Sequence, residues 1–187
     1  VHAREEHDQF AKTLRACGVE VCYLLDLTAE AVREAGVQER LVDDFVAEMG
    51  ISAHGVEEAV RTYLLDMPVP QMLSAMVRGV RKSELGAREH NHLVDFIDDA
   101  YPFYVDPMPN LYFTRDPFFM VGDGVCISSM ANVVRARETL FGCCLFQNHP
   151  VYKNTPMRHM RDDPFSIEGG DVLVLSKEVI AIGISQR

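Results

Sequence analysis

The sequence predicts an α/β protein in which ββαβ units repeat radially or in layers, next to a region of short helices. The helical prediction comes from apolar residues that recur at a helical period between about residues 28 and 94. The repeat prediction comes from the second half, which follows the order strand, strand, helix, strand and then a further strand pair. Charge divides the chain similarly, because residues 1–100 carry 19 acidic and 10 basic residues, whereas residues 101–187 carry 9 and 8.

The first half begins with a predicted helix from about Arg4 to Cys17, which Gly18 is well placed to end. Residues 19–25 alternate in a way that predicts a buried strand. Apolar stripes separated by Gly or Pro then predict short helices that form a small bundle. The stripes are Leu41, Val42, Phe45, Val46 and Met49; Val56, Val60 and Leu64; and Met72, Leu73, Met76, Val77 and Val80.

The second half predicts strands, a hairpin and one helix. Prolines hold residues 101–110 extended, because proline restricts its own φ angle and the residue before it. The glycines of Gly122-Asp123-Gly124 predict a hairpin turn. The predicted elements are strands at 118–121 and 125–128, a helix at 131–141, a strand in 143–146, and a strand pair at 172–175 and 179–184.

Composition excludes some classes of function. A net charge of −10 disfavours a general binder of nucleic acid or of anionic membranes. No apolar run approaches the length of a membrane span, and no secretory signal is visible, so we expect a cytoplasmic protein. The five cysteines have no C-x-x-C spacing and are expected to be reduced core thiols. His90 and His92 form either a zinc site or a solvated loop, and the loop is favoured without further ligands at suitable spacing.

The chain also opens on Val1 and closes shortly after a predicted apolar strand. An apolar strand left unpaired at a terminus is an aggregation hazard that complete domains usually cover. We therefore expect the chain to be a piece of a longer protein.

Carboxylates in two segments are candidates for a binding site. Asp116 ends a proline-bounded segment that also holds Asn110 and Phe113, although it could instead cap a turn while Arg115 pairs with a neighbouring acid. Glu168 and Asp171 flank two glycines, which permit a bulge and a close approach of another group. These two carboxylates could converge on one pocket, or they could be solvated acids in a glycine turn.

Arginines supply the complementary charge. Arg135 follows two valines and could face a pocket, and Arg187 lies at the end of the chain. A guanidinium group binds carboxylates through a fork of donors. For Arg137 and Glu138 we expect solvated charges on a helix surface. Carboxylates and arginines in one segment together suit a zwitterionic ligand with a cationic end.

These motifs resemble the arginine deiminase family of the guanidine-modifying superfamily. The resemblance covers nearly the whole chain, in order, through Met108-Pro-Asn-Leu-Tyr-Phe-Thr-Arg-Asp-Pro117, Arg135 with Arg137-Glu-Thr139, Ile167-Glu-Gly-Gly-Asp171 and Gly183-Ile-Ser-Gln-Arg187. It implies an incomplete five-fold pseudosymmetric α/β propeller with an inserted helical bundle. The implied boundaries are propeller at 1–26, helical insertion at 27–97, and propeller with half of the substrate site at 98–187.

The resemblance implies hydrolysis of L-arginine to L-citrulline and ammonia, without metal or organic cofactor, by a full-length homo-oligomer. In the family, a cysteine thiolate attacks the guanidinium carbon, histidine supplies a proton to the leaving ammonia, and water hydrolyses the covalent intermediate. Carried onto this chain, Asp116 grips the guanidinium, Glu168 supports the site near the reacting carbon, and Asp171 assists it. The implied remaining contacts are Arg135 and Arg187 on the substrate α-carboxylate, with Asn110 and Phe113 shaping the pocket.

The family's nucleophilic cysteine and its histidine have no match here, and we expect both to lie outside this chain. The chain alone is therefore expected to be inactive. Two alternatives are a non-catalytic arginine-binding or interaction module, and another guanidine-modifying hydrolase such as one acting on agmatine or dimethylarginine.

Overall fold

The computed structural model describes residues 2–50, 55–85 and 101–184, and it combines helices with small sheets. The helices are α1 (His2–Ala16), α2 (Leu24–Ala31), α3 (Val37–Ala47), α4 (Val56–Leu65), α5 (Val69–Arg78) and α7 (Thr139–Asn148). The strands are β1 (Val80–Arg81), β2 (Phe103–Val105), β3 (Phe118–Val121), β4 (Gly124–Ile127), β5 (Met157–His159), β6 (Val172–Val174) and β7 (Ile180–Ile182). Short 3₁₀ helices are η1 (Lys82–Glu84), η2 (Val133–Glu138) and η3 (Gly169–Asp171).

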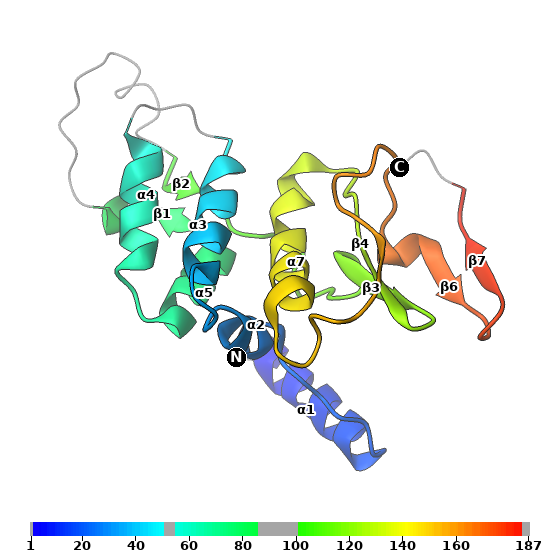
Figure 1. Ribbon diagram of the computed structural model, residues 1–187. Coiled ribbons are helices and arrows are strands. Elements are labelled where there is room, and N and C mark those ends of the chain that lie inside the picture. Colours follow the sequence, from blue (N-terminus) through cyan, green and yellow to red (C-terminus); the bar gives the residue numbers. More distant parts are fainter. Residues whose placement is uncertain (1, 51–54, 86–100, 185–187) are drawn as a thin grey trace.

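Most of the helices lie on one side of the molecule and most of the strands on the other, with the short sheet of β1 and β2 beside the helices (Figure 1). Figure 1 shows α3, α4 and α5 gathered at one side, β3, β4, β6 and β7 at the other, and α7 between them. The sheets have the orders β1-β2, β3-β4-β5 and β6-β7, and within the described residues they form no closed barrel. The predicted α/β class is thus confirmed.

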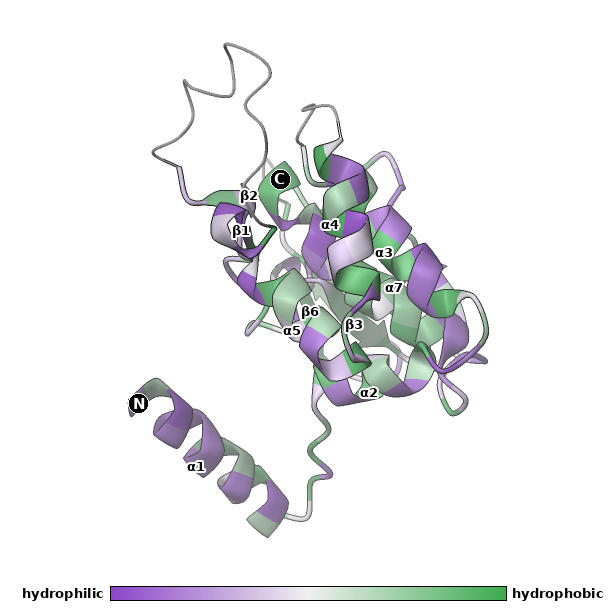
Figure 2. Cartoon of the chain, turned by 90° about the vertical axis from the view of Figure 1, so that its left-hand side faces the viewer, coloured by the Kyte–Doolittle hydropathy of each residue, from purple (hydrophilic) through white to green (hydrophobic). Residues whose placement is uncertain are grey.

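Helix α1 confirms the first prediction, and Gly18 follows it with a φ angle of +80°. Glycine reaches this left-handed region without a Cβ clash, so it lets the chain leave the helix. Ala11 is buried, whereas Phe10 is 63% exposed. Figure 2 shows α1 standing apart from the rest of the chain. The helix therefore adds little to the core of the described residues.

The strand predicted over residues 19–25 is wrong. Residues 19–23 have no regular structure, and α2 begins at Leu24. Val19 and Tyr23, which the alternation placed on a buried face, are both exposed. A strand needs a paired neighbour for its stability. None of the described strands lies beside this segment, so alternation alone misled the prediction.

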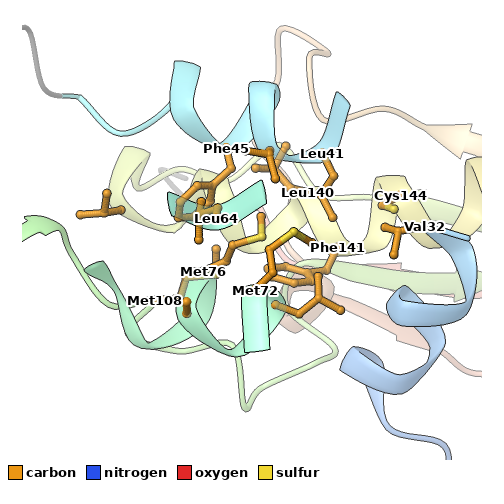
Figure 3. Close-up of a cluster of buried hydrophobic side chains, with 14 of the residues drawn as sticks. Val32, Leu41, Phe45, Leu64, Met72, Met76, Met108, Leu140, Phe141 and Cys144 are labelled. Carbon is orange, nitrogen blue, oxygen red and sulfur yellow. The ribbon is translucent and has the colours of Figure 1, made fainter. Parts of the chain in front are cut away.

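Helices α2 to α5 pack around an apolar core, as the stripes predict. Phe45, Leu64 and Met72 of three different helices are fully buried in it (Figure 3). Pro68 precedes α5 and Pro70 lies in its first turn, where a missing N–H removes no helical hydrogen bond. Each fully buried large side chain contributes about 1.5–3 kcal/mol. This shared core is therefore the main stabilising feature of the helical part.

The second half contains the predicted hairpin and strand pair. Strands β3 and β4 pair antiparallel with Phe118 opposite Ile127, and Gly122 in their turn has a φ angle of +62°. Strands β6 and β7 are also antiparallel. Strand β2 lies within the stretch that the prolines hold extended, and it pairs with β1. Strand β5 runs parallel to β4 and lies in a stretch for which no element was predicted, because its three residues Met157, Arg158 and His159 give no strand pattern.

The strand predicted in residues 143–146 is wrong, because these residues belong to α7. The predicted helix at 131–141 is instead η2 followed by the start of α7. One side of α7, with Phe141 and Cys144, packs in the core of the helical part, while Leu145 and Phe146 pack on the sheet side. A helix buried on both sides shows a continuous apolar run, which periodicity does not distinguish from a buried strand.

Candidate active site

Asp116 and Glu168 lie on two segments that backbone hydrogen bonds hold together. The carbonyl oxygen of Asp116 accepts hydrogen bonds from the Ser128 hydroxyl and from the Gly169 N–H. Nearby, Ile167 and Ser129 form an isolated antiparallel bridge. The loop before β3 and the loop before β6 are thereby placed side by side, which brings the two predicted carboxylates into one region.

Gly169 permits this close approach. A Cβ atom at Gly169 would lie 1.9 Å from the carbonyl oxygen of Arg115, a distance at which the backbone would have to move. At Gly170 the nearest atom would be Asp116 Oδ1 at 3.6 Å, which is ordinary contact. The expectation that a glycine here lets another group approach is therefore confirmed for Gly169. Arg115 donates to the carbonyl oxygens of Gly169 and Val172, and among the described residues it forms no ion pair with an acid.

The guanidinium of Arg135 lies among three carboxylates. Its Nη1 is 3.1 Å from Asp116 Oδ2 and 3.6 Å from Glu168 Oε2. Its Nε and Nη2 donate to Glu138 Oε2 at 3.0 and 2.8 Å. Burial alone would lower the pKa of Arg135, but the hydrogen bonds and charges of Glu138 and Asp116 outweigh it and raise that pKa. The structure thus joins three of the predicted site residues around one permanently charged group.

The prediction that Arg137 and Glu138 are solvated charges is wrong, because both residues are buried. Arg137 lies over the ring of Phe45 in α3 and donates to the carbonyl oxygen of Asp106. Burial lowers the pKa of Arg137. Glu138 accepts hydrogen bonds from the Arg135 side chain and from the backbone N–H of Asn110, which lies 28 residues earlier in the chain. The spacing Arg135-x-x-Glu138 could have identified Glu138 as a partner of Arg135, because it places the two side chains on one helical face.

The remaining predicted residues take different positions. The Asn110 N–H donates to Glu138 Oε1 at 3.1 Å, and Phe113 is about half exposed next to Asn110. Asp171 accepts a hydrogen bond from the Glu168 N–H at 3.1 Å, so its carboxylate supports the bend that carries Glu168. Arg187 lies outside the described residues, as do His90 and His92.

An open depression of about 660 Å³ lies beside this cluster. Its lining includes Asn132, Val133, Arg135 and Glu168. Pockets for small ligands commonly have volumes of about 300–1,000 Å³. The lining itself holds one carboxylate, that of Glu168, and one arginine, and the carboxylates of Asp116 and Glu138 contact the same arginine. That arrangement favours a cationic ligand group.

The buried cysteines lack the setting of a nucleophile. Burial raises the pKa of Cys143 to about 11 and that of Cys144 to about 12, and it also raises the pKa of Cys126. The nucleophilic form of cysteine is the thiolate. At neutral pH these three side chains are therefore thiols.

No three His, Cys, Asp or Glu side chains in residues 2–50, 55–85 and 101–184 are placed to hold a metal ion. Among the helices of the same ranges, none combines the length and apolarity of a membrane span.

Comparison with known proteins bears on the whole chain. A family model described as arginine deiminase matches residues 1–187. An arginine deiminase of Staphylococcus haemolyticus (strain JCSC1435) is 47% identical over 187 residues, which are 99% of this chain and 45% of that protein. Arginine deiminases of Staphylococcus aureus (strain JH9) and Clostridium perfringens (strain SM101 / Type A) are each 46% identical, again over 99% of this chain. The chain spans about half the length of these curated relatives. Because the match runs from the first residue to the last, this chain belongs to the arginine deiminase family.

Proposed function

We propose that this chain forms about half of an arginine deiminase, which hydrolyses L-arginine to L-citrulline and ammonia. The family match over residues 1–187 carries this proposal. The site supports it, because Asp116 and Glu168 already pair with one guanidinium, that of Arg135. Free arginine presents the same planar group with the same donors.

Binding of arginine at Asp116 would exchange one guanidinium for another. The carboxylate of Asp116 would turn from Nη1 of Arg135 to the substrate, while Nε and Nη2 of Arg135 would stay on Glu138. The carboxylate of Asp116 would be paired before and after the exchange. The exchange therefore avoids an unpaired charge at a partly buried position, which is costly.

The proposed roles follow the two ends of the substrate. Asp116 grips the guanidinium and Glu168 lies near the reacting carbon, with Asp171 holding the bend beneath Glu168. Arg135 and Arg187 bind the α-carboxylate. Charged pairs at both ends would fix a flexible substrate in one register, and such positioning supplies a large share of enzymatic rate.

Asn110 and Phe113 are proposed to shape the pocket. Both belong to the loop that follows β2, and the backbone of Asn110 is held by Glu138. The exposed face of Phe113 is available to the aliphatic part of a substrate.

The covalent steps are assigned to groups in the part of the enzyme that this chain does not span. There a cysteine thiolate forms a bond to the guanidinium carbon, and a C–N bond breaks as ammonia leaves with a proton from histidine. Water then adds to the same carbon, the C–S bond breaks, and citrulline is released. The high pKa values of Cys143 and Cys144 support this assignment.

We also propose that the chain contributes part of a five-fold α/β propeller, with residues 27–97 as a helical insertion and residues 1–26 and 98–187 as propeller. The order β3, β4, α7, β5 supports this, because it is a ββαβ unit whose last strand is parallel to β4. The apolar core shared by α2 to α5 supports the helical insertion.

The test is to measure citrulline and ammonia formed by the full-length enzyme from L-arginine and to compare agmatine, which lacks the carboxylate. We expect equal amounts of the two products from arginine. For agmatine we expect a kcat/KM lower by about 10²-fold or more, since the charged contacts that Arg135 and Arg187 make with the α-carboxylate would be lost. Absence of citrulline would refute the proposed activity, and equal use of agmatine would refute the roles of Arg135 and Arg187.

A further inference from the structure

Glu138 joins two segments that both carry proposed substrate-binding residues. Its side chain is completely buried. Oε1 accepts a hydrogen bond from the backbone N–H of Asn110, in the loop after β2. Oε2 accepts from both Nε and Nη2 of Arg135, in η2. One carboxylate therefore fixes the position of a loop and the direction of an arginine at the same time.

This set of partners requires a carboxylate. Three N–H donors point at the two oxygens of Glu138, one at Oε1 and two at Oε2. A glutamine has one acceptor oxygen and one NH₂ group, so in either orientation its NH₂ would face a donor. A buried carboxylate is costly to desolvate and is retained only when its partners compensate.

Glu138 also decides which N–H groups of Arg135 remain for a ligand. A guanidinium has five N–H groups, and Glu138 engages Nε and one N–H of Nη2. The end of the group that carries Nη1 is left to face Asp116, Glu168 and the open depression. We propose that Glu138 is a positioning residue that holds Arg135 by Nε and Nη2, so that the end of the guanidinium that carries Nη1 binds the α-carboxylate of the substrate.

This inference rests on the proposed function, and it differs from a purely structural role for the ion pair. A structural pair would affect stability and the use of all substrates alike. A positioning role predicts an effect that depends on the substrate carboxylate, because Arg135 binds that group and not the guanidinium end.

Glu84 provides a matched control elsewhere in the chain. Its Oε1 lies 2.6 Å from Nη2 of Arg78, and its Oε2 accepts from the Arg81 N–H at 2.8 Å. It therefore also joins an arginine side chain to a backbone N–H. The hydrogen bond from the Arg78 side chain is the main cause that lowers the pKa of Glu84, to about 2. These partners belong to the helical part and not to the cluster around Arg135.

The experiment compares Glu138→Gln with Glu84→Gln in the full-length enzyme. For Glu138→Gln we expect the KM for L-arginine to rise about 10–100-fold with kcat within about threefold, while kcat/KM for agmatine changes less than about threefold. For Glu84→Gln we expect both substrates to keep their wild-type parameters although the melting temperature falls. Equal losses for arginine and agmatine in Glu138→Gln, or no loss for arginine, would overturn the proposal.

A double-mutant cycle provides the second readout. Once Arg135→Ala has removed the group that Glu138 orients, adding Glu138→Gln should raise the KM for arginine by no more than about twofold. Multiplicative effects would overturn the proposal. If Glu138→Gln fails to fold, Arg135→Lys tests the inference instead, because lysine keeps the positive charge but lacks the planar set of N–H donors that binds two carboxylates. An unchanged arginine KM in Arg135→Lys would contradict the inference, whereas absence of citrulline from the unmodified enzyme would refute the underlying function itself.

Discussion

At the scale of single residues, burial determines the chemistry of the cysteines. Cys143 and Cys144 sit in the middle of α7, where apolar side chains from the helical part and from the sheet surround the helix. An apolar environment disfavours the thiolate, which raises the pKa of Cys143 to about 11 and that of Cys144 to about 12. These residues therefore serve packing and not nucleophilic attack.

The thiol assignment predicts slow alkylation of the folded enzyme. At pH 8, Cys143 and Cys144 should react with iodoacetamide about 10²–10³-fold more slowly than after denaturation, because so little thiolate is present. Peptide mapping by mass spectrometry over time measures both rates. A Cys143→Ser variant should keep kcat within about threefold. Loss of turnover in a folded Cys143→Ser protein would contradict the assignment of the nucleophile to a cysteine outside this chain.

Sequence reasoning identified Asp116, Arg135 and Glu168, and the structure brings their side chains together. It misjudged Arg137 and Glu138, because the groups that bury them come from distant parts of the chain. Phe45 lies in α3 and Asn110 lies in the loop after β2. A local window shows a charged pair near a helix, but not the surfaces that will cover it.

At the scale of elements, the bend at η3 is the feature that aligns the carboxylates. Gly169 lies against the carbonyl oxygen of Arg115, and the Arg115 side chain returns to bind the carbonyl oxygen of Gly169. The segment carrying Asp116 and the segment carrying Glu168 are thus held together by backbone contacts on both sides. The two neighbouring glycines differ sharply in the space around them.

That difference predicts opposite outcomes for two alanine substitutions. Gly169→Ala should lower the free energy of unfolding by about 1–3 kcal/mol and reduce kcat/KM by about 10²-fold, since the added methyl group forces the segments apart. Gly170→Ala should cost less than about 1 kcal/mol and keep most activity, because its Cβ has ordinary contacts. Chemical denaturation and citrulline assays measure both variants. Similar behaviour of the two would contradict the account of the bend.

Element prediction succeeded where turns or stripes constrained it, and it failed for a helix that is buried on both sides and for an alternating segment without a partner strand. The β3–β4 hairpin followed from its glycine turn, and the helices of the bundle followed from their stripes. In contrast, α7 is apolar on both sides, and residues 19–23 alternate without a partner strand. For α7 the missing information is the two surfaces that cover it, whereas for residues 19–23 it is that none of the described strands pairs with them.

At the scale of the whole molecule, the site is built where the two parts of the chain meet. Helix α7 contributes to the core of the helical part and to the packing against β4. Arg161 bonds to Glu48 at the end of α3 at 2.6 Å, and Arg137 covers Phe45 of the same helix. The helical part therefore supports η2, which carries Arg135 and Glu138. The relation between two distant parts of the chain was not predictable from either part alone.

We propose that Asp116 is the carboxylate that binds the guanidinium of arginine in the full-length enzyme. Its side chain pairs with Arg135, whereas its backbone carbonyl makes the bonds that hold the loops, so removing the charge leaves those bonds in place. The most direct measurement is the kcat/KM for L-arginine of Asp116→Asn in the full-length enzyme, with circular dichroism and thermal melting to confirm the fold. We predict a loss of at least about 10²–10³-fold with the fold retained. Turnover at the wild-type level in a folded Asp116→Asn enzyme would contradict the account.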